Sequence, residues 1–267
     1  MRSSAMRCTW VSTARYVIIW MRFADAGDAG SKKQDPAYIR YVGRVLFFGP
    51  AVLALLFSVA LLAAAPRRVT FRAEDGVTLG AAYYEPGRQP APGILLLHML
   101  RRSHADWDAA ASQLSDAGFA VLALDFRGGD DVAALARDVR AAKAFLRERP
   151  EVMGASIGIA GASLGANLAL AAAADDPGVS SVALLSPGLD YKGVRTEAAM
   201  KKYGARSAVL MGSTKDPYSA RSIRHLITIG PGTREVRLTD AVAHGTVLLA
   251  RDPQLVGALV DWFRRTL

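Results

Sequence analysis

After residue 66 the sequence alternates between strand-like and helix-like segments, and this alternation restricts the fold more than any other feature. Residues 93–98 (GILLLH) are apolar almost throughout, which is typical of a strand buried on both faces. Residues 132–149 instead have the apolar spacing of a helix, which Pro150 ends. Strands and helices that alternate in this way predict an α/β fold, a mainly parallel central β-sheet with helices on both faces.

The expected elements can be given by their residue ranges. A hairpin is expected at 69–84, and Asp106 is expected to cap the helix at 107–117. The strands are predicted at 69–72, 77–84, 93–98, 119–126, 156–162, 179–186, 207–212 and 235–238, and the helices at 107–117, 132–149, 164–174, 196–203, 218–226 and 246–267.

A long apolar segment precedes this region. Residues 45–65 (VLFFGPAVLALLFSVALLAAA) contain no charge, and a helix of that length spans about 30 Å, the thickness of a hydrocarbon core. Soluble helices rarely run this long without a polar face, so the segment predicts a transmembrane anchor. The chain then divides into an N-terminal segment at 1–44, the anchor at 45–65 and a globular domain at 66–267.

Positive charge is denser before the anchor than after it. Residues 1–65 carry a net charge of +5, and four of their Lys and Arg residues lie at 32–44. This asymmetry predicts a cytoplasmic N-terminus and a globular domain outside the cytoplasm, in the periplasm or at the cell surface. Cleavage after the small residues at 63–65 is the alternative, and it would give a secreted protein.

The net charge of +9 first suggests a nucleic-acid partner. However, residues 66–267 contribute only +4, their charges are of mixed sign, and no nucleic-acid-binding motif is present. Cys8 is the only cysteine, which excludes an intrachain disulfide and a cysteine metal cluster. We therefore expect no nucleic-acid partner, no metal and no cofactor.

Residues 161–165 (GASLG) match the pattern GxSxG, and they lie between an expected strand and an expected helix. That is the position of a nucleophile elbow, in which a tight and strained turn lifts the serine hydroxyl clear of the sheet. Small neighbours are required at such a turn, and Gly161, Ala162 and Gly165 meet this requirement. The pattern makes Ser163 the candidate nucleophile.

A serine hydroxyl needs a base and an oriented imidazole to become a good nucleophile. His244 is the candidate base, because it follows the last expected strand and is the only histidine far enough downstream for the order serine, acid, histidine. Asp216 follows the penultimate strand and is the favoured acid. Asp190, which follows the strand before that, remains the rival.

Residues 69–267 resemble the α/β-hydrolase superfamily, and most of all its dienelactone hydrolase-like branch of small serine esterases. The stretches that carry the resemblance are LLLHML at 95–100, ADWDAAASQLSDAGFAVLALDFRGGD at 105–130, IGIAGASLGANLAL at 157–170, LMGSTKD at 210–216 and AVAHG at 241–245.

The resemblance implies an oxyanion hole made of two backbone N–H groups. Leu164 would supply one, and the loop after the strand at 93–98 would supply the other, from Leu100 or, as second choice, Met99. Relatives usually read His-Gly where this chain reads His98-Met99, and one such donor is worth about 3–4 kcal/mol. Relatives also often carry a cap domain; residues 188–205 are too few for a large one, so we expect an open, shallow site.

These residues and the resemblance together predict a carboxylesterase-like serine hydrolase (EC 3.1.1) that acts on a small acyl ester through an acyl-enzyme. A peptidase, thioesterase or acyltransferase would use the same residues. A membrane-tethered binding domain without catalysis is the alternative from a different class of function, although it would not need all three residues in this order.

Overall fold

The computed structural model describes residues 65–267. The predicted N-terminal segment at 1–44 and the predicted anchor or signal segment at 45–65 lie outside the described residues, apart from Ala65. Within the described range, none of the helices combines the length and the apolar character that a membrane span requires.

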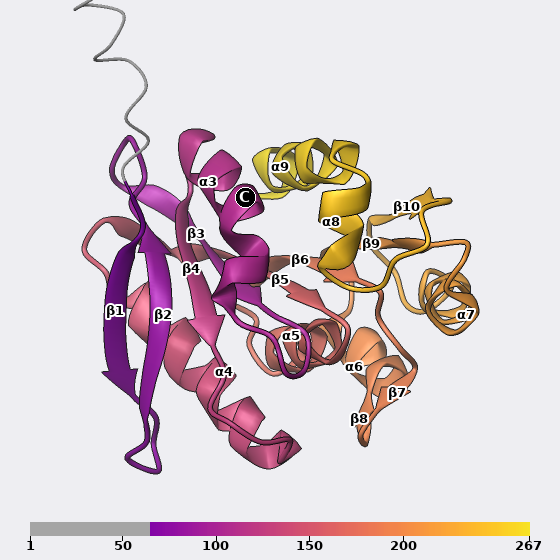
Figure 1. Ribbon diagram of the computed structural model, residues 1–267, viewed down its shortest axis with the longest axis horizontal. Coiled ribbons are helices and arrows are strands. Elements are labelled where there is room, and N and C mark those ends of the chain that lie inside the picture. Colours follow the sequence, from indigo (N-terminus) through magenta and orange to yellow (C-terminus); the bar gives the residue numbers. More distant parts are fainter. Residues whose placement is uncertain (1–64) are drawn as a thin grey trace, which may run out of the picture. The chain divides into compact units, whose positions relative to one another are not determined.

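A single eight-stranded sheet organises the domain (Figure 1), with the strand order β1-β2-β4-β3-β5-β6-β9-β10. β1 pairs antiparallel with β2 and β2 antiparallel with β4, whereas all other neighbours are parallel. The strands are β1 (Arg67–Arg72), β2 (Thr78–Tyr84), β3 (Ala91–Leu97), β4 (Ala120–Asp125), β5 (Val152–Ala162), β6 (Val179–Leu185), β9 (Ser207–Ser213) and β10 (Arg234–Thr239). Because the parallel strands all end at one edge, the loops that follow them meet there.

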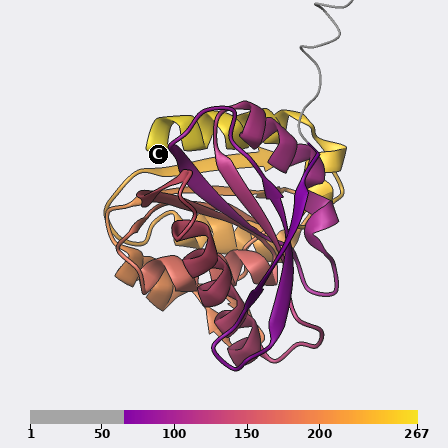
Figure 2. The same ribbon diagram turned by 90° about the vertical axis from the view of Figure 1, so that its left-hand side faces the viewer.

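Helices cover both faces of the sheet, as Figure 2 shows from the side of the N-terminal hairpin. The side chains of α4, α5, α6 and α7 pack in one apolar core and those of α3, α8 and α9 in the other. The helices are α3 (Asp108–Asp116), α4 (Val132–Arg147), α5 (Leu164–Ala174), α6 (Thr196–Tyr203), α7 (Pro217–Leu226), α8 (Val247–Arg251) and α9 (Gln254–Thr266), preceded by the short 3₁₀ helix η2 (His104–Trp107). The fold prediction, a mainly parallel sheet between two helical layers, is confirmed.

Besides the division of the helix expected at 246–267 into α8 and α9, two details differ from the sequence expectation. Asp106 does not cap the first helix: α3 has Trp107 at its N-cap without a side-chain cap, because η2 precedes it and Asp106 accepts hydrogen bonds from Arg102 and Thr246 instead. The second difference is a two-stranded ribbon, β7 (Asp190–Tyr191) and β8 (Val194–Arg195), between β6 and α6. Strands of two residues are too short to give an alternating pattern.

Candidate active site

Ser163 occupies the sharp turn between the central strand β5 and α5. Its φ of 54° and ψ of −120° lie outside the regions that L-residues prefer, so the turn is strained. The glycines on either side permit the turn: a Cβ at Gly161 would overlap the Gly165 carbonyl, and one at Gly165 would lie 2.5 Å from the His98 carbonyl oxygen. The turn therefore presents the Ser163 side chain at the carboxyl edge of the sheet.

Ser163, His244 and Asp216 are connected by hydrogen bonds. The His244 Nε2 lies 2.7 Å from the Ser163 Oγ, and the His244 Nδ1 lies 2.6 Å from the Asp216 Oδ2. A carboxylate can only accept hydrogen bonds, so the His244 Nδ1 carries the proton that faces Asp216. The His244 Nε2 is then unprotonated and can take the proton of the serine hydroxyl. The structure thus brings together the three residues that the sequence singled out.

The loops that carry the acid and the histidine are fixed to their neighbours. Asp216 caps α7, since its Oδ1 accepts from the Ser219 N–H at 3.2 Å. The loop after β10 is held on one side of His244 by Ser213, whose hydroxyl donates to the Ala241 carbonyl. On the other side the Gly245 N–H donates to Ser186 Oγ at 3.0 Å. These bonds limit the movement of the imidazole relative to Ser163.

The rival carboxylate lies elsewhere. Asp190 is in β7, where it accepts from the Gly193 N–H at 2.7 Å and pairs with Arg195 at the surface. The remaining histidines also have other partners: His104 contacts Asp125, and His225 contacts Glu197. The geometry therefore selects Asp216 as the partner of His244.

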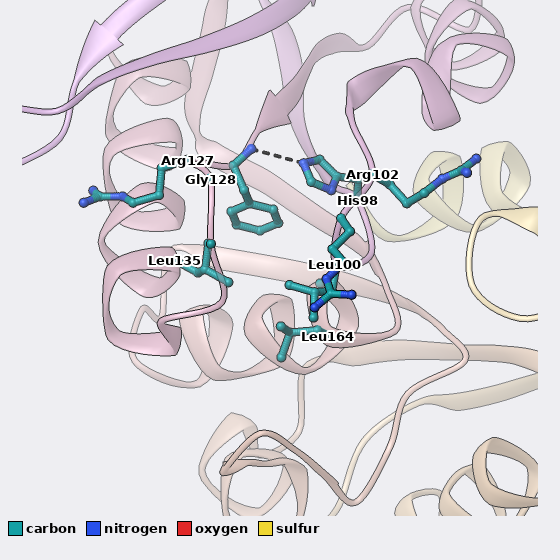
Figure 3. A pocket seen from close by; sticks show the side chains of 11 residues that line it. His98, Leu100, Arg102, Arg127, Gly128, Leu135 and Leu164 are labelled. Carbon is teal, nitrogen blue, oxygen red and sulfur yellow. Dashed lines mark hydrogen bonds between the residues drawn. The ribbon is translucent and has the colours of Figure 1, made fainter.

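The loop after β3 is fixed by His98. The His98 Nε2 accepts from the Phe126 N–H at 3.1 Å, which leaves the Nδ1 to donate to the Met99 carbonyl at 2.7 Å (the first of these bonds is dashed in Figure 3). His98 is thus held as the neutral imidazole, and burial, the largest influence, lowers its pKa below the ordinary value.

The Met99 carbonyl also accepts from the Arg102 N–H at 3.2 Å. In a trans peptide the C=O and the following N–H point in opposite directions, so these two bonds fix the direction of the Leu100 N–H. Within residues 65–267, the Leu100 N–H donates to no other protein group. This peptide can therefore offer a hydrogen-bond donor to a ligand.

The bond from Arg102 to Met99 closes a β-turn, in which the third residue, Arg101, has a φ of 62°. Among the described non-glycine residues only four have positive φ, and Met99 and Leu100 are not among them. This combination is that of a type II turn, in which the third position favours glycine. The glycine of relatives at position 99 is thus not required here by the backbone, and the strain lies at Arg101 instead.

Solved structures resemble this chain over about three quarters of its length. A dienelactone hydrolase from Anabaena variabilis superposes with a TM-score of 0.65 at 19% identity, covering 76% of this chain and 100% of that chain. The esterase domain of a Rhodothermus marinus protein gives a TM-score of 0.62 at 23% identity, covering 75% and 99%. An esterase from Pyrococcus furiosus gives 0.62 at 18% identity, covering 77% and 94%. The chain has the α/β-hydrolase fold. No protein-family model and no curated protein matches the sequence.

In this α/β-hydrolase fold, a cavity of about 120 Å³ lies beside the nucleophile elbow. Figure 3 shows the side chains of Leu100, Leu135 and Leu164 facing its interior, whereas Arg102 and Arg127 extend away from it. Arg102 is paired with Asp106, and Arg127 with Asp75 and Asp138, while Arg101 is a third arginine in the lining. Apolar side chains thus lie next to the two expected N–H donors, in a cavity whose lining also includes the polar residues His98 and Arg101.

Tyr191 is a site residue that the sequence reading missed. It belongs to β7, and its ring lies perpendicular to that of His244, with 6.3 Å between the centroids. Because the ribbon β7–β8 is so short, it has no hydrophobic periodicity from which it could be predicted.

The part of the chain that the structure describes contains no group of three or more His, Cys, Asp or Glu residues that could hold a metal ion.

Proposed function

We propose that the chain is a serine hydrolase that cleaves carboxylic esters through an acyl-enzyme intermediate. The observation that carries the proposal is the continuous relay from Ser163 through His244 to Asp216, with bonds of 2.7 Å and 2.6 Å at a strained elbow. Esterases and a dienelactone hydrolase among the similar structures support this class of reaction by analogy of fold.

Each residue has a defined step in this proposal. The Ser163 Oγ attacks the ester carbonyl carbon while its proton passes to the His244 Nε2, and Asp216 stabilises the imidazolium that results. The negative charge then develops on the carbonyl oxygen, which the backbone N–H groups of Leu164 and Leu100 bind. Collapse breaks the carbon–oxygen bond to the alcohol, which takes the proton from His244. Water, activated by the same histidine, releases the acid.

We assign the cavity beside Leu100 and Leu164 to the acyl group of the substrate, and its size favours short acyl groups. Its volume of about 120 Å³ is smaller than the roughly 150 Å³ of an engineered apolar cavity that holds benzene, so it admits a chain of about four or five carbons. Across p-nitrophenyl esters of rising chain length, we expect kcat/KM to be highest up to about this length and to decline beyond it. A preference for chains of ten or more carbons would contradict this assignment of the cavity.

Labelling with a fluorophosphonate probe tests the nucleophile. The wild-type protein should be labelled and Ser163→Ala should not, and the variant should lose ester hydrolysis by roughly 10⁴- to 10⁶-fold. Ser115→Ala is a matched control and should stay labelled, since the Ser115 hydroxyl donates to the Glu85 carbonyl and contacts none of the three relay residues. If the wild-type protein is not labelled, the proposal fails.

We also propose, from the sequence alone, that residues 45–65 anchor the domain to a membrane with the catalytic domain outside the cytoplasm. Fractionation of cells, followed by alkaline extraction of the membranes, tests this proposal. An anchored protein stays in the pellet and is digested by protease added to intact spheroplasts. Release into the medium as a shorter chain would indicate a cleaved signal segment instead.

A further inference from the structure

The ribbon β7–β8 brings a second hydroxyl group to the proposed catalytic serine. The Tyr191 ring stands edge-on to His244, and its hydroxyl donates a long hydrogen bond of 3.4 Å to the Ser186 carbonyl. Burial raises the pKa of Tyr191, and the Asp216 carboxylate raises it further, while the side chain of Ser163 lowers it. The ring thus lies beside the histidine of the relay, and the hydroxyl stays protonated, as a donor, throughout the neutral range.

The ribbon is rigidly attached to the rest of the domain. The buried amide of Asn167, in α5, donates to the Val194 carbonyl at 2.8 Å and accepts from the Gly188 N–H at 3.1 Å. From α7, the Tyr218 hydroxyl accepts from the Asp190 N–H at 3.0 Å and donates to the Asp190 carbonyl at 2.9 Å. Both helices begin at residues of the relay, so Tyr191 is positioned by the same elements as Ser163 and Asp216.

The ribbon itself turns tightly, which keeps Tyr191 close to the site. Lys192 and Gly193 both have positive φ, 53° and 86°, which is the combination of a two-residue type I′ turn. β7 and β8 pair antiparallel across this turn. Tyr191 is the residue immediately before the turn, and its ring is fixed against that of Tyr218, with 5.6 Å between the centroids.

The order of the strands around β5 indicates which oxygen atom of a bound ester lies on the side of Tyr191. β3 and β6 flank β5 on opposite sides, and the Leu100 donor follows β3 whereas Tyr191 follows β6. The carbonyl oxygen of a substrate turns toward Leu100 and Leu164, and the leaving oxygen must turn toward the His244 Nε2 to receive its proton. Tyr191 shares that second side with His244.

We propose that Tyr191 is a further catalytic residue, whose hydroxyl donates a hydrogen bond to the leaving-group oxygen as the tetrahedral intermediate collapses. In this step the bond from carbon to the leaving oxygen breaks and its electron pair goes to that oxygen. The proton comes from the His244 Nε2, and Tyr191 keeps its own proton. The assignment rests on the ester hydrolysis proposed above and names the group that assists the departure of a poor leaving group.

The experiment compares two esters of one acid, ethyl acetate and p-nitrophenyl acetate, in Tyr191→Phe. The oxygen of ethanol is strongly basic and leaves only as His244 protonates it, so a second hydrogen bond to it should speed the step, whereas p-nitrophenolate leaves readily without such help. We expect kcat/KM for ethyl acetate to fall by roughly 10- to 100-fold, and that for p-nitrophenyl acetate by less than about threefold. Because kcat/KM reports the steps through the first irreversible one, slow deacylation does not mask the difference.

Tyr218→Phe is the matched control, because it also removes a tyrosine hydroxyl but loosens only the backbone of the ribbon. It should change the ratio of the two kcat/KM values less than Tyr191→Phe does, because the Tyr191 hydroxyl is retained and its ring can still pack against the ring at position 218. The ratio of the two rates is measured on the same sample, so a loss of folded protein cancels. Equal effects on both esters in Tyr191→Phe, or no effect on either, would overturn the role of Tyr191. Failure of the proposed hydrolase function would instead appear in the wild-type protein, as no labelling at Ser163.

Discussion

The two sides of Ser163 present different kinds of chemical group, side chains on one side and backbone N–H groups on the other. On the side of β6, β9 and β10, the groups proposed to transfer the proton are side chains: His244 lies 2.7 Å from the Ser163 Oγ and 2.6 Å from the Asp216 Oδ2. On the side of β3, the expected donors are backbone N–H groups of Leu100 and Leu164, and side chains act there only by holding the backbone. The acid–base side therefore depends on which residues are present, and the oxyanion side on how the chain is turned. The two sides should respond differently to substitution.

The largest effect is expected on the acid–base side, from Asp216→Asn. The amide presents an N–H₂ group or a weaker acceptor to the His244 Nδ1 and favours the wrong tautomer, so kcat should fall by roughly 10³- to 10⁴-fold. Asparagine is also a good N-cap, so α7 should remain folded. Steady-state kinetics with p-nitrophenyl acetate measure the loss, and circular dichroism checks the fold.

Asp190→Asn is the matched control for that substitution. Asp190 is half exposed and accepts from the Gly193 N–H, which an asparagine oxygen can also do. Its kcat should stay within about threefold of the wild-type value, since the residue does not contact His244. A larger loss in Asp190→Asn than in Asp216→Asn would exchange the roles of the two carboxylates.

The same contrast explains what the sequence could predict. The order of elements and the residues of the acid–base side follow from local patterns: apolar strands, the GASLG elbow at 161–165, and polar residues just after strands. By contrast, the direction of the Leu100 N–H depends on the His98 ring, which is fixed by the Phe126 N–H from the neighbouring strand end. Tyr191 was missed for a similar reason, because it is placed by bonds from Asn167 and Tyr218. Long-range hydrogen bonds leave no periodic pattern in a sequence.

On the oxyanion side, Leu100→Pro removes the proposed donor without removing the turn. Proline has no N–H but favours the second position of a type II turn, which Leu100 occupies. We expect kcat to fall by roughly 10²- to 10³-fold with little change in KM. The affinity for a boronic acid that mimics the tetrahedral intermediate should fall in parallel with kcat.

Leu100→Ala provides the control for the proline variant, because it shortens the side chain but keeps the N–H. It should retain kcat within about tenfold, and any change should depend on acyl length, since Leu100 lines the cavity. If Leu100→Pro keeps full activity, the donor is a different group, and the N–H of Met99 is the next to examine.

A smaller effect is expected from Arg101→Gly, which tests where the loop stores its strain. Arg101 has a φ of 62°, and a non-glycine residue in the left-handed region costs about 1–2 kcal/mol, partly offset by the extra flexibility that glycine has in the unfolded chain. The free energy of unfolding should rise by about 0.5–1 kcal/mol, measured by urea denaturation. Arg102→Gly is the control and should be destabilising, since Arg102 pairs with Asp106. No gain in Arg101→Gly would mean that contacts of the arginine side chain offset the strain.

The smallest expected effect is the contribution of His98 to the pH dependence of the free energy of unfolding. Burial lowers its pKa in the folded protein, so between the unfolded value near 6.5 and the lower folded value the unfolded chain binds more protons. Stability from this source is complete above pH of about 6.5 and is lost progressively as the pH falls toward the folded pKa. His98→Gln cannot titrate, yet its amide has both a donor and an acceptor for Met99 and Phe126. The free energy of unfolding of the wild-type protein should therefore fall more than that of the variant between pH 7.5 and pH 5. Because all other titrating groups are common to both proteins, parallel curves would show that His98 is not held neutral, and the account of how the Leu100 N–H is oriented would have to change.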